Sequence, residues 1–149
     1  MQTAAAISTH TGAPKVIDSN LREIDLGDWA TSDPETHKIT HKEYFEEWSK
    51  HLTDMPYPGG ESGADVVKRT HGLFDTLLNS ELENVAIVTH GGVIRILFSS
   101  FLQLGLEKRF SIDVENCSIS VISFNRLSKT YRINRINDTA HLEELCKLI

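Results

Sequence analysis

Residues 84–98, NVAIVTHGGVIRILF, place a histidine and two glycines between two apolar runs. The first run, Val85–Val88, has no polar face, which is the pattern of a strand buried on both sides. The second run favours a helix. His90 would then stand beside a helix N-terminus, whose free N–H groups attract an anion, while Gly91 and Gly92 would let a ligand approach the backbone. We therefore expect an anion site at this turn; a satisfied histidine in a tight turn is the alternative.

Two further motifs precede this turn and change its interpretation. LREIDLGDW occupies 21–29 and PGGES occupies 58–62, followed by THGG at 89–92. In this order and at this spacing they resemble the histidine phosphatase superfamily, also called phosphoglycerate mutase-like. The likeness is greatest to its compact branch of small-molecule phosphatases, such as α-ribazole phosphatase. It runs from the first residue to about Phe124, and NCSIS at 116–120 also fits.

The resemblance implies a fold, a reaction and roles for named residues. It implies a three-layer α/β/α fold with a mixed sheet, and hydrolysis of a small phosphorylated metabolite through a phosphohistidine, without cofactor. Glu23 would exchange protons with the leaving oxygen and with water, a contribution of about 100- to 10,000-fold in rate. His90, Gly91 and Gly92 would hold the phosphoryl oxygens, whose charge such reactions must stabilise. Alternatively, Glu23 is a surface carboxylate paired with Arg22.

Phosphoglycerate mutase-type phosphoryl transfer is the near alternative to hydrolysis. Only 67 residues separate Glu23 from His90 in the sequence, whereas the glycolytic mutases carry a longer insertion there. We therefore favour a phosphatase. An unrelated α/β binding domain is a remote third interpretation, because the three motifs occur in the family's order.

The chain departs from the family at the nucleophile. The family's nucleophilic histidine lies in an Arg-His-Gly motif on its first strand, and no such triplet occurs among these 149 residues. A second phosphate-binding arginine precedes an (A/M)-Q-T-A stretch in the family, and this chain begins MQTA. We therefore expect an N-terminally truncated phosphatase that lacks the first two strands and is inactive alone. It would need a complementing N-terminal segment or a strand-exchanged homo-oligomer; a non-catalytic binder of phosphate or of a partner is the other interpretation.

Composition narrows the partners and the compartment. The net charge is −6 with no Lys/Arg block, which argues against nucleic acid and anionic membranes as partners. Two cysteines without metal-ligand spacing fit a reducing cytoplasm. No stretch has the length and hydropathy of a membrane helix. These features predict a cytoplasmic α/β domain spanning 1–149 without an internal linker.

The elements that would position these residues can be read from caps and periodicity. Helix starts are expected at Ser32-Asp33-Pro34, at a capping box over Thr40–Glu43 and at a second one formed by Ser62 and Asp65. A helical lid would cover about 32–58. The remaining expectations are a helix over 1–10, a strand over Lys15–Asp18, a helix after THGG that ends at Gly105, strands over 117–124 and 131–136, and a helix over 141–149.

The remaining candidates for chemistry are weaker. His37 and His41 have the i, i+4 spacing of a metal clamp, but no third ligand follows at matching spacing, so we expect no metal. Arg95 is expected to point along its helix toward a carboxylate rather than into the site. The other histidines lie outside strand–turn contexts and are expected to be solvated or to serve packing.

Overall fold

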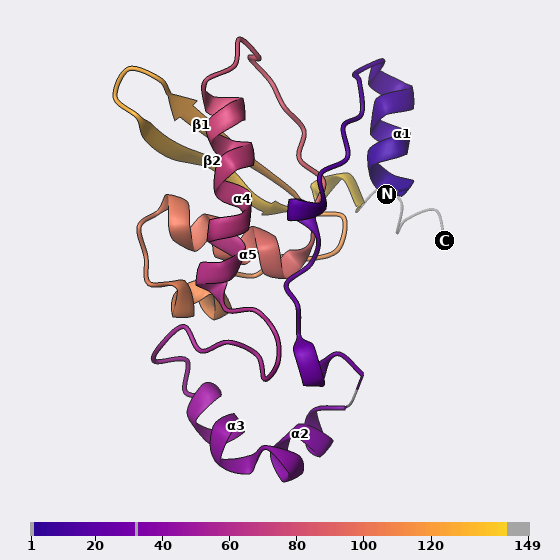
Figure 1. The fold of residues 1–149 in the computed structure, drawn as a ribbon. Helices are drawn as coiled ribbons and strands as arrows, with labels where there is room; N and C mark the ends of the chain where they lie inside the picture. Colours follow the sequence, from indigo (N-terminus) through magenta and orange to yellow (C-terminus); the bar gives the residue numbers. More distant parts are fainter. Residues whose placement is uncertain (1, 32, 143–149) are drawn as a thin grey trace.

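The computed structural model describes residues 2–31 and 33–142. Helices and a small antiparallel sheet make a mixed α/β fold, which confirms the expected class (Figure 1). Among the described helices, none combines the length and hydropathy needed to cross a membrane. The α-helices are α1 (Gln2–Thr11), α2 (Pro34–Thr40), α3 (Lys42–Trp48), α4 (Gly63–Leu78) and α5 (Gly91–Phe101). The 3₁₀ turns are η1 (Ser19–Leu21), η2 (Gly27–Trp29) and η3 (Leu106–Ser111), and the strands are β1 (Ile119–Asn125) and β2 (Thr130–Asp138).

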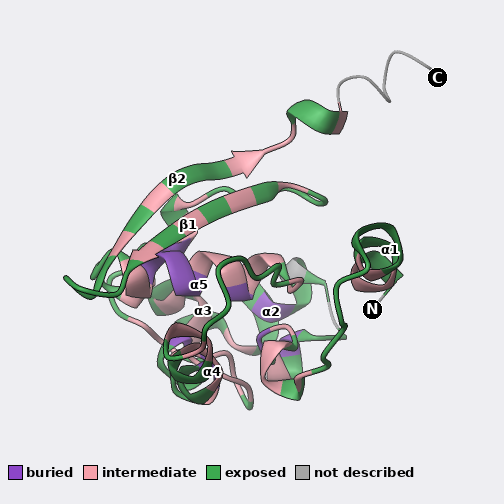
Figure 2. Cartoon of the chain, turned by 90° about the horizontal axis from the view of Figure 1, so that it is seen from above, coloured by how far each residue is buried: buried purple, intermediate pink, exposed green. Residues whose placement is uncertain are grey.

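The core lies where α4 and α5 pack against each other and against the segment that follows η1. Its buried members are Ile24, Val66, Val93, Ile96 and Leu97. Figure 2 shows the buried residues of α5 beneath the β1–β2 hairpin, and α1 standing apart from this core. The core therefore joins the two segments that carry the first and third motifs.

The β1–β2 hairpin confirms the two strands expected near the C-terminus. The strands pair antiparallel with Phe124 opposite Tyr131, and exposed and half-buried residues alternate along β1. Tyr131 stacks on Phe101 at the end of α5, with ring centroids 4.4 Å apart. This aromatic contact seats the hairpin on α5. The helix expected over 141–149 extends into residues 143–149, which lie outside the described part of the chain.

Two other expected strands are wrong. Lys15–Asp18 and Val85–Val88 are neither helix nor strand, and the sheet of the described residues has two strands only. Val85 and Ile87 are 47% and 37% exposed rather than buried. The β-branched pattern makes these segments suited to a sheet, but pairing needs a neighbouring strand, and no described residue supplies one.

Helix starts follow the predicted caps in two of three cases. The Asp33 side chain accepts a hydrogen bond from the Thr36 N–H at 2.9 Å and caps α2. Ser62 and Asp65 form the expected capping box of α4. The capping box over Thr40–Glu43 is wrong, because Thr40 is the last residue of α2 and its hydroxyl donates to the Thr36 carbonyl instead.

Helix α5 ends at Phe101, four residues before the expected stop at Gly105. Gln103 takes the left-handed conformation (φ 55°), and the Leu104 N–H turns back to the Ser99 carbonyl at 2.9 Å. Gln103 thus follows the helix end in the conformation that glycine usually supplies, so the prediction of Gly105 as the stop was wrong.

Segment 33–58 carries α2 and α3 and packs its aromatic side chains around Trp29. The Trp29 ring is 7% exposed and lies 4.9 Å from the His37 ring, stacked on it. Other ring centroids lie within 6.4 Å of Trp29, namely those of Tyr44, Phe45, Trp48 and Tyr57. Trp29 therefore anchors the whole helical segment to the first motif, LREIDLGDW.

An ion pair fastens the end of this segment to α4 and η3. Asp54 accepts hydrogen bonds from the Gly63 and Ala64 N–H groups at 2.9 and 2.8 Å, at the start of α4. The same carboxylate pairs with Arg109, whose side chain is 4% exposed. Arg109 also donates to the Leu106 carbonyl at 2.9 Å. A helix N-terminus and a buried guanidinium thus meet one carboxylate.

Breaking this pair should destabilise the chain. Arg109→Met leaves the Asp54 carboxylate without its cation, and we expect a loss of about 3–5 kcal/mol in the free energy of unfolding. Urea unfolding followed by tryptophan fluorescence measures the loss. The matched control is Arg135→Met, which removes a 60% exposed arginine paired with Asp138 and should leave the urea midpoint unchanged. Equal midpoints for the two variants would contradict the assignment.

His51 should make stability depend on pH. Its ring stacks on Phe110 with centroids 3.7 Å apart, and burial, together with the charge of Arg109, lowers its pKa below the ordinary value. The unfolded chain therefore binds the proton more readily, so stability should fall as pH falls from about 7.5 to about 5.5. His51 has φ 49°, which asparagine tolerates. The urea midpoint of His51→Asn should fall less steeply over this range; parallel curves would show that His51 does not contribute.

Candidate active site

The turn between the extended segment and α5 presents backbone N–H groups with little side-chain bulk. His90 is the N-cap residue of α5 with an extended backbone, and its side chain makes no capping hydrogen bond. Gly91 and Gly92 form the first helical turn, and α5 carries no acidic residue there. The His90 side chain is exposed. Because α5 has no acidic residue of its own in this turn, any negative charge at the positive end of its dipole must come from another part of the chain or from a ligand.

The Glu23 carboxylate supplies this charge. Glu23 lies between η1 and η2, and its Oε2 accepts a hydrogen bond from the Gly92 N–H at 3.3 Å. Its Oε1 accepts from the Ile24 N–H at 2.9 Å. A Cβ on Gly92 would lie 2.7 Å from Glu23 Oε1, so only glycine allows this approach. The structure thus brings the Glu23 carboxylate to the first turn of α5. The residue that it contacts there, Gly92, is two positions after His90 in the sequence.

A second hydrogen bond joins the same two segments. The Thr89 hydroxyl donates to the Leu21 carbonyl at 2.7 Å, two residues before Glu23. Ile24, the next residue after Glu23, is buried in the core beside Val93. Thr89 and the first turn of α5 therefore contact the Glu23 segment on both sides of its carboxylate.

The PGGES motif packs against LREIDLGDW through the backbone. The Asp28 N–H donates to the Pro58 carbonyl at 2.8 Å, and the Glu61 N–H donates to the Asp25 carbonyl at 2.9 Å. Gly27 has φ 51°, and a Cβ there would lie 2.2 Å from the Pro58 oxygen. All three motifs therefore form one connected structure.

Tyr57 borders this region from the aromatic segment. Burial raises the pKa of its phenol, with Arg109 opposing the shift, the Glu23 carboxylate adding to it and Arg95 opposing it more weakly. Tyr57 thus lies within electrostatic reach of the predicted acid. Sequence reasoning gave it no role, although it directly precedes PGGES.

Arg95 does not behave as expected. It forms no ion pair among the described residues, and its Nε is buried without a hydrogen-bond partner there. It lies in the second turn of α5, where the sequence predicted that it would point along the helix to a carboxylate.

His37 and His41 do not form a metal clamp with a third ligand. Within residues 2–31 and 33–142, no group of three His, Cys, Asp or Glu side chains is arranged to hold a metal ion. The His37 ring is instead buried against Trp29. A separate hollow of about 340 Å³ lies between the end of α4 and the hairpin, lined in part by Asp75, Arg126 and Lys129, and it includes none of the predicted site residues.

Comparison with known proteins decides the family. The profile of the histidine phosphatase superfamily (branch 1) matches residues 1–139. The chain belongs to this superfamily. This confirms the resemblance carried by the three motifs.

Similar proteins carry both phosphatase and mutase names. A putative phosphoserine phosphatase 2 of Hydrogenobacter thermophilus is 27% identical over 144 residues, which are 97% of this chain and 70% of that protein. A probable phosphoglycerate mutase GpmB of Yersinia pestis is 28% identical, over 95% of this chain and 68% of that protein. Proteins named as phosphatases and proteins named as mutases are thus both similar to this chain.

Solved structures share the fold. The mycobacterial glucosyl-3-phosphoglycerate phosphatase in complex with inorganic phosphate superposes with a TM-score of 0.79 at 27% identity, covering 93% of this chain and 72% of its own. The α-ribazole phosphatase from Shigella flexneri superposes with a TM-score of 0.75 at 21% identity, covering 91% and 67%. The chain therefore has the phosphoglycerate mutase-like fold.

Filling the space at Gly92 should displace Glu23. An alanine in a helix is ordinarily favoured over glycine by about 1 kcal/mol, but at position 92 the new methyl would meet Glu23 Oε1 at 2.7 Å and Ile24 Cγ2 at 2.9 Å. We expect Gly92→Ala to lose that gain and, through overpacking, to destabilise by about 1–3 kcal/mol.

The matched control is Gly72→Ala in α4, where an added Cβ meets nothing within 4 Å. It should stabilise by about 0.4–1 kcal/mol in the same urea unfolding experiment. If Gly92→Ala stabilises as much as Gly72→Ala, the close approach of Glu23 to α5 is wrong.

Proposed function

We propose that the protein works in hydrolysis of a phosphomonoester of a small metabolite, through a phosphohistidine. Glu23 is the proton donor and acceptor, and His90 with the N–H groups of Gly91 and Gly92 holds the phosphoryl oxygens. The observation that carries this proposal is the Glu23 carboxylate at the N-terminus of α5, 3.3 Å from the Gly92 nitrogen. A carboxyl group and a helix N-terminus at one point suit a reaction that must both stabilise oxygen charge and protonate a leaving group.

The proposed reaction has two steps. A histidine nitrogen attacks phosphorus, the bond to the ester oxygen breaks, and Glu23 gives its proton to that oxygen. Water then attacks phosphorus, the N–P bond breaks, and Glu23 takes the proton of the water, which leaves orthophosphate. The names of relatives that act on phosphorylated metabolites support this substrate class.

We further propose that the nucleophile comes from a segment outside these 149 residues, because no histidine in the sequence follows an arginine. The exposed β-branched residues support this proposal. Val16 and Ile17 are 87% and 64% exposed, and the backbone of residues 84–89 makes no hydrogen bond to other described backbone groups. A complementing N-terminal segment, or strands exchanged with a second copy, would pair these segments. Burial of each exposed aliphatic side chain would then stabilise the fold by about 1.5–3 kcal/mol.

The helical segment 33–58 would be the lid over the site, since its aromatic side chains pack around Trp29 at the end of the motif that carries Glu23. A cytoplasmic setting is part of the same proposal, supported by the low cysteine content.

A non-catalytic binder of phosphate is the second candidate for the chain alone. The absence of an Arg-His-Gly triplet favours it. In that case the chain binds orthophosphate at α5 but releases no product from a phosphomonoester.

The two candidates are separated by extending the chain. The 149-residue chain and a chain extended upstream in frame are assayed with p-nitrophenyl phosphate. We expect no turnover by the former and turnover by the latter. Glu23→Gln and His90→Ala in the extended chain should each lower kcat by about 100-fold or more, because each removes a proton or a charge contact from the transition state.

The controls use a residue remote from the site. Gly72→Ala in the extended chain should keep its kcat. If the upstream frame encodes no Arg-His-Gly triplet, or if activity survives both site substitutions, the proposed function is wrong.

A further inference from the structure

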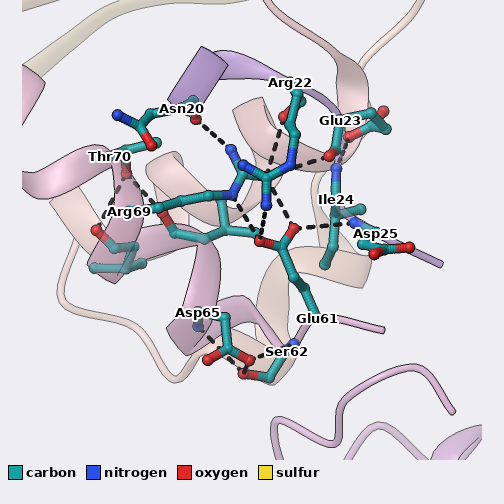
Figure 3. Close-up of polar contacts among 12 residues, drawn as sticks. Asn20, Arg22, Glu23, Ile24, Asp25, Glu61, Ser62, Asp65, Arg69 and Thr70 are labelled. Atoms are coloured by element: carbon teal, nitrogen blue, oxygen red, sulfur yellow. Dashed lines mark hydrogen bonds and ion pairs between the residues drawn. The ribbon is translucent and has the colours of Figure 1, made fainter. Parts of the chain in front are cut away.

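Arg69 and Glu61 form a low-exposure ion pair beneath the Glu23 segment (Figure 3). Arg69 projects from α4, and Glu61 directly precedes the α4 N-cap residue. The guanidinium is bidentate, with Nε 2.9 Å from Oε1 and Nη2 3.1 Å from Oε2. The two side chains are 9% and 14% exposed.

The same guanidinium binds three backbone carbonyl groups at or shortly before Glu23. It donates to the carbonyl oxygens of Asn20, of Arg22 at 3.0 Å and of Glu23 itself at 3.3 Å. Glu61 Oε2 accepts from the Asp25 N–H at 3.0 Å. The pair therefore fixes the chain immediately before and after the Glu23 side chain.

We propose that Arg69, held by Glu61, is the positioning residue that brings the Glu23 carboxylate to the first turn of α5. The inference rests on the proposed role of Glu23 as proton donor. Among the described residues, Arg69 makes no hydrogen bond or ion pair with the α5 turn, so it acts through the backbone that it holds. This gives PGGES a second role besides capping α4, because its glutamate orients the arginine.

Arginine suits this task because its planar fork offers five donors in fixed directions. In Arg69, Nε and Nη2 donate to the Glu61 carboxylate. Nη1 and Nη2 also donate to the backbone carbonyls. A lysine would bring one nitrogen to one place. Burial of the pair keeps water from replacing these contacts.

Arg22 provides a matched comparison in the same cluster. It pairs with the same Glu61 Oε1 at 2.8 Å, but its side chain is 54% exposed and makes none of the carbonyl contacts. Both arginines compensate the Glu61 charge, and only Arg69 holds the backbone. Substituting each separately distinguishes charge compensation from positioning.

The test reads the Glu23–Gly92 contact directly. In the 149-residue chain, the Gly92 amide proton should lie downfield in a ¹H–¹⁵N spectrum, because that N–H donates to the Glu23 carboxylate. Glu23→Ala removes the acceptor, so it should move the resonance upfield and assigns the contact. We expect Arg69→Gln to move the resonance too, while Arg22→Gln leaves it in place.

Each outcome bears on the inference. If Arg69→Gln leaves the Gly92 resonance in place, or if Arg22→Gln moves it equally, positioning by Arg69 is wrong. If Arg69→Gln does not fold, Arg69→Lys replaces it. That variant keeps the charge beside Glu61 with fewer directed donors, so it should move the Gly92 resonance part of the way, and an unmoved resonance would also overturn the inference.

Activity of the extended chain separates this inference from the proposed function. Arg69→Lys there should lower kcat with little change in KM, whereas Arg22→Lys should alter neither. If Glu23→Gln leaves activity intact while Arg69→Gln still moves the Gly92 resonance, the proposed acid is wrong and the positional relation remains. If Glu23→Gln abolishes activity while Gly92 is unaffected in Arg69→Gln, the reverse holds.

Discussion

The hydrogen bond between the Glu23 carboxylate and the Gly92 N–H is the contact on which the site depends. It joins two chain segments that are far apart in the sequence and that have no strand pairing between them. Neither Glu23 nor His90 would indicate a site by itself, because an isolated surface carboxylate and an exposed histidine are ordinary features. Together they place a carboxylate at the positive end of a helix, beside a histidine. The fold serves chiefly to keep this contact in one geometry.

That geometry is held by backbone approach as much as by side chains. Gly60 lies so close to the first motif that a Cβ there would be 2.3 Å from the Asp25 oxygen. Trp29 at the end of the same motif is enclosed by aromatic rings, and Ile24 enters the core. The segment therefore has a polar residue facing the site, an apolar residue facing the core and an aromatic anchor. A carboxylate on such a segment has few other positions available.

Local signals in the sequence predicted two of the three helix caps, whereas Thr40–Glu43 forms no capping box. Asp33 and the pair Ser62 and Asp65 cap helices as expected, because a cap needs only residues within one turn. The two strands near the C-terminus followed from alternation, and the family resemblance was the reason to look for Glu23 near the THGG turn. Val85–Val88 failed as a strand because a β-branched run specifies suitability for a sheet but not a partner. Arg69 was missed because its partners are carbonyl groups of a distant loop; its only local signal is an arginine three residues after the buried Val66.

A helix N-terminus occupied by a carboxylate raises the question of how a phosphoryl group would share it. The net charge of −6 gives no general attraction for anions, so binding must come from the few groups at this turn. In the proposed reaction, the phosphoryl group and the Glu23 carboxylate would therefore share the N–H groups of one helix turn. Arg69 and Glu61 hold the backbone on both sides of Glu23. This support would fix the distance between the carboxyl group and the ester oxygen that the proposal has it protonate.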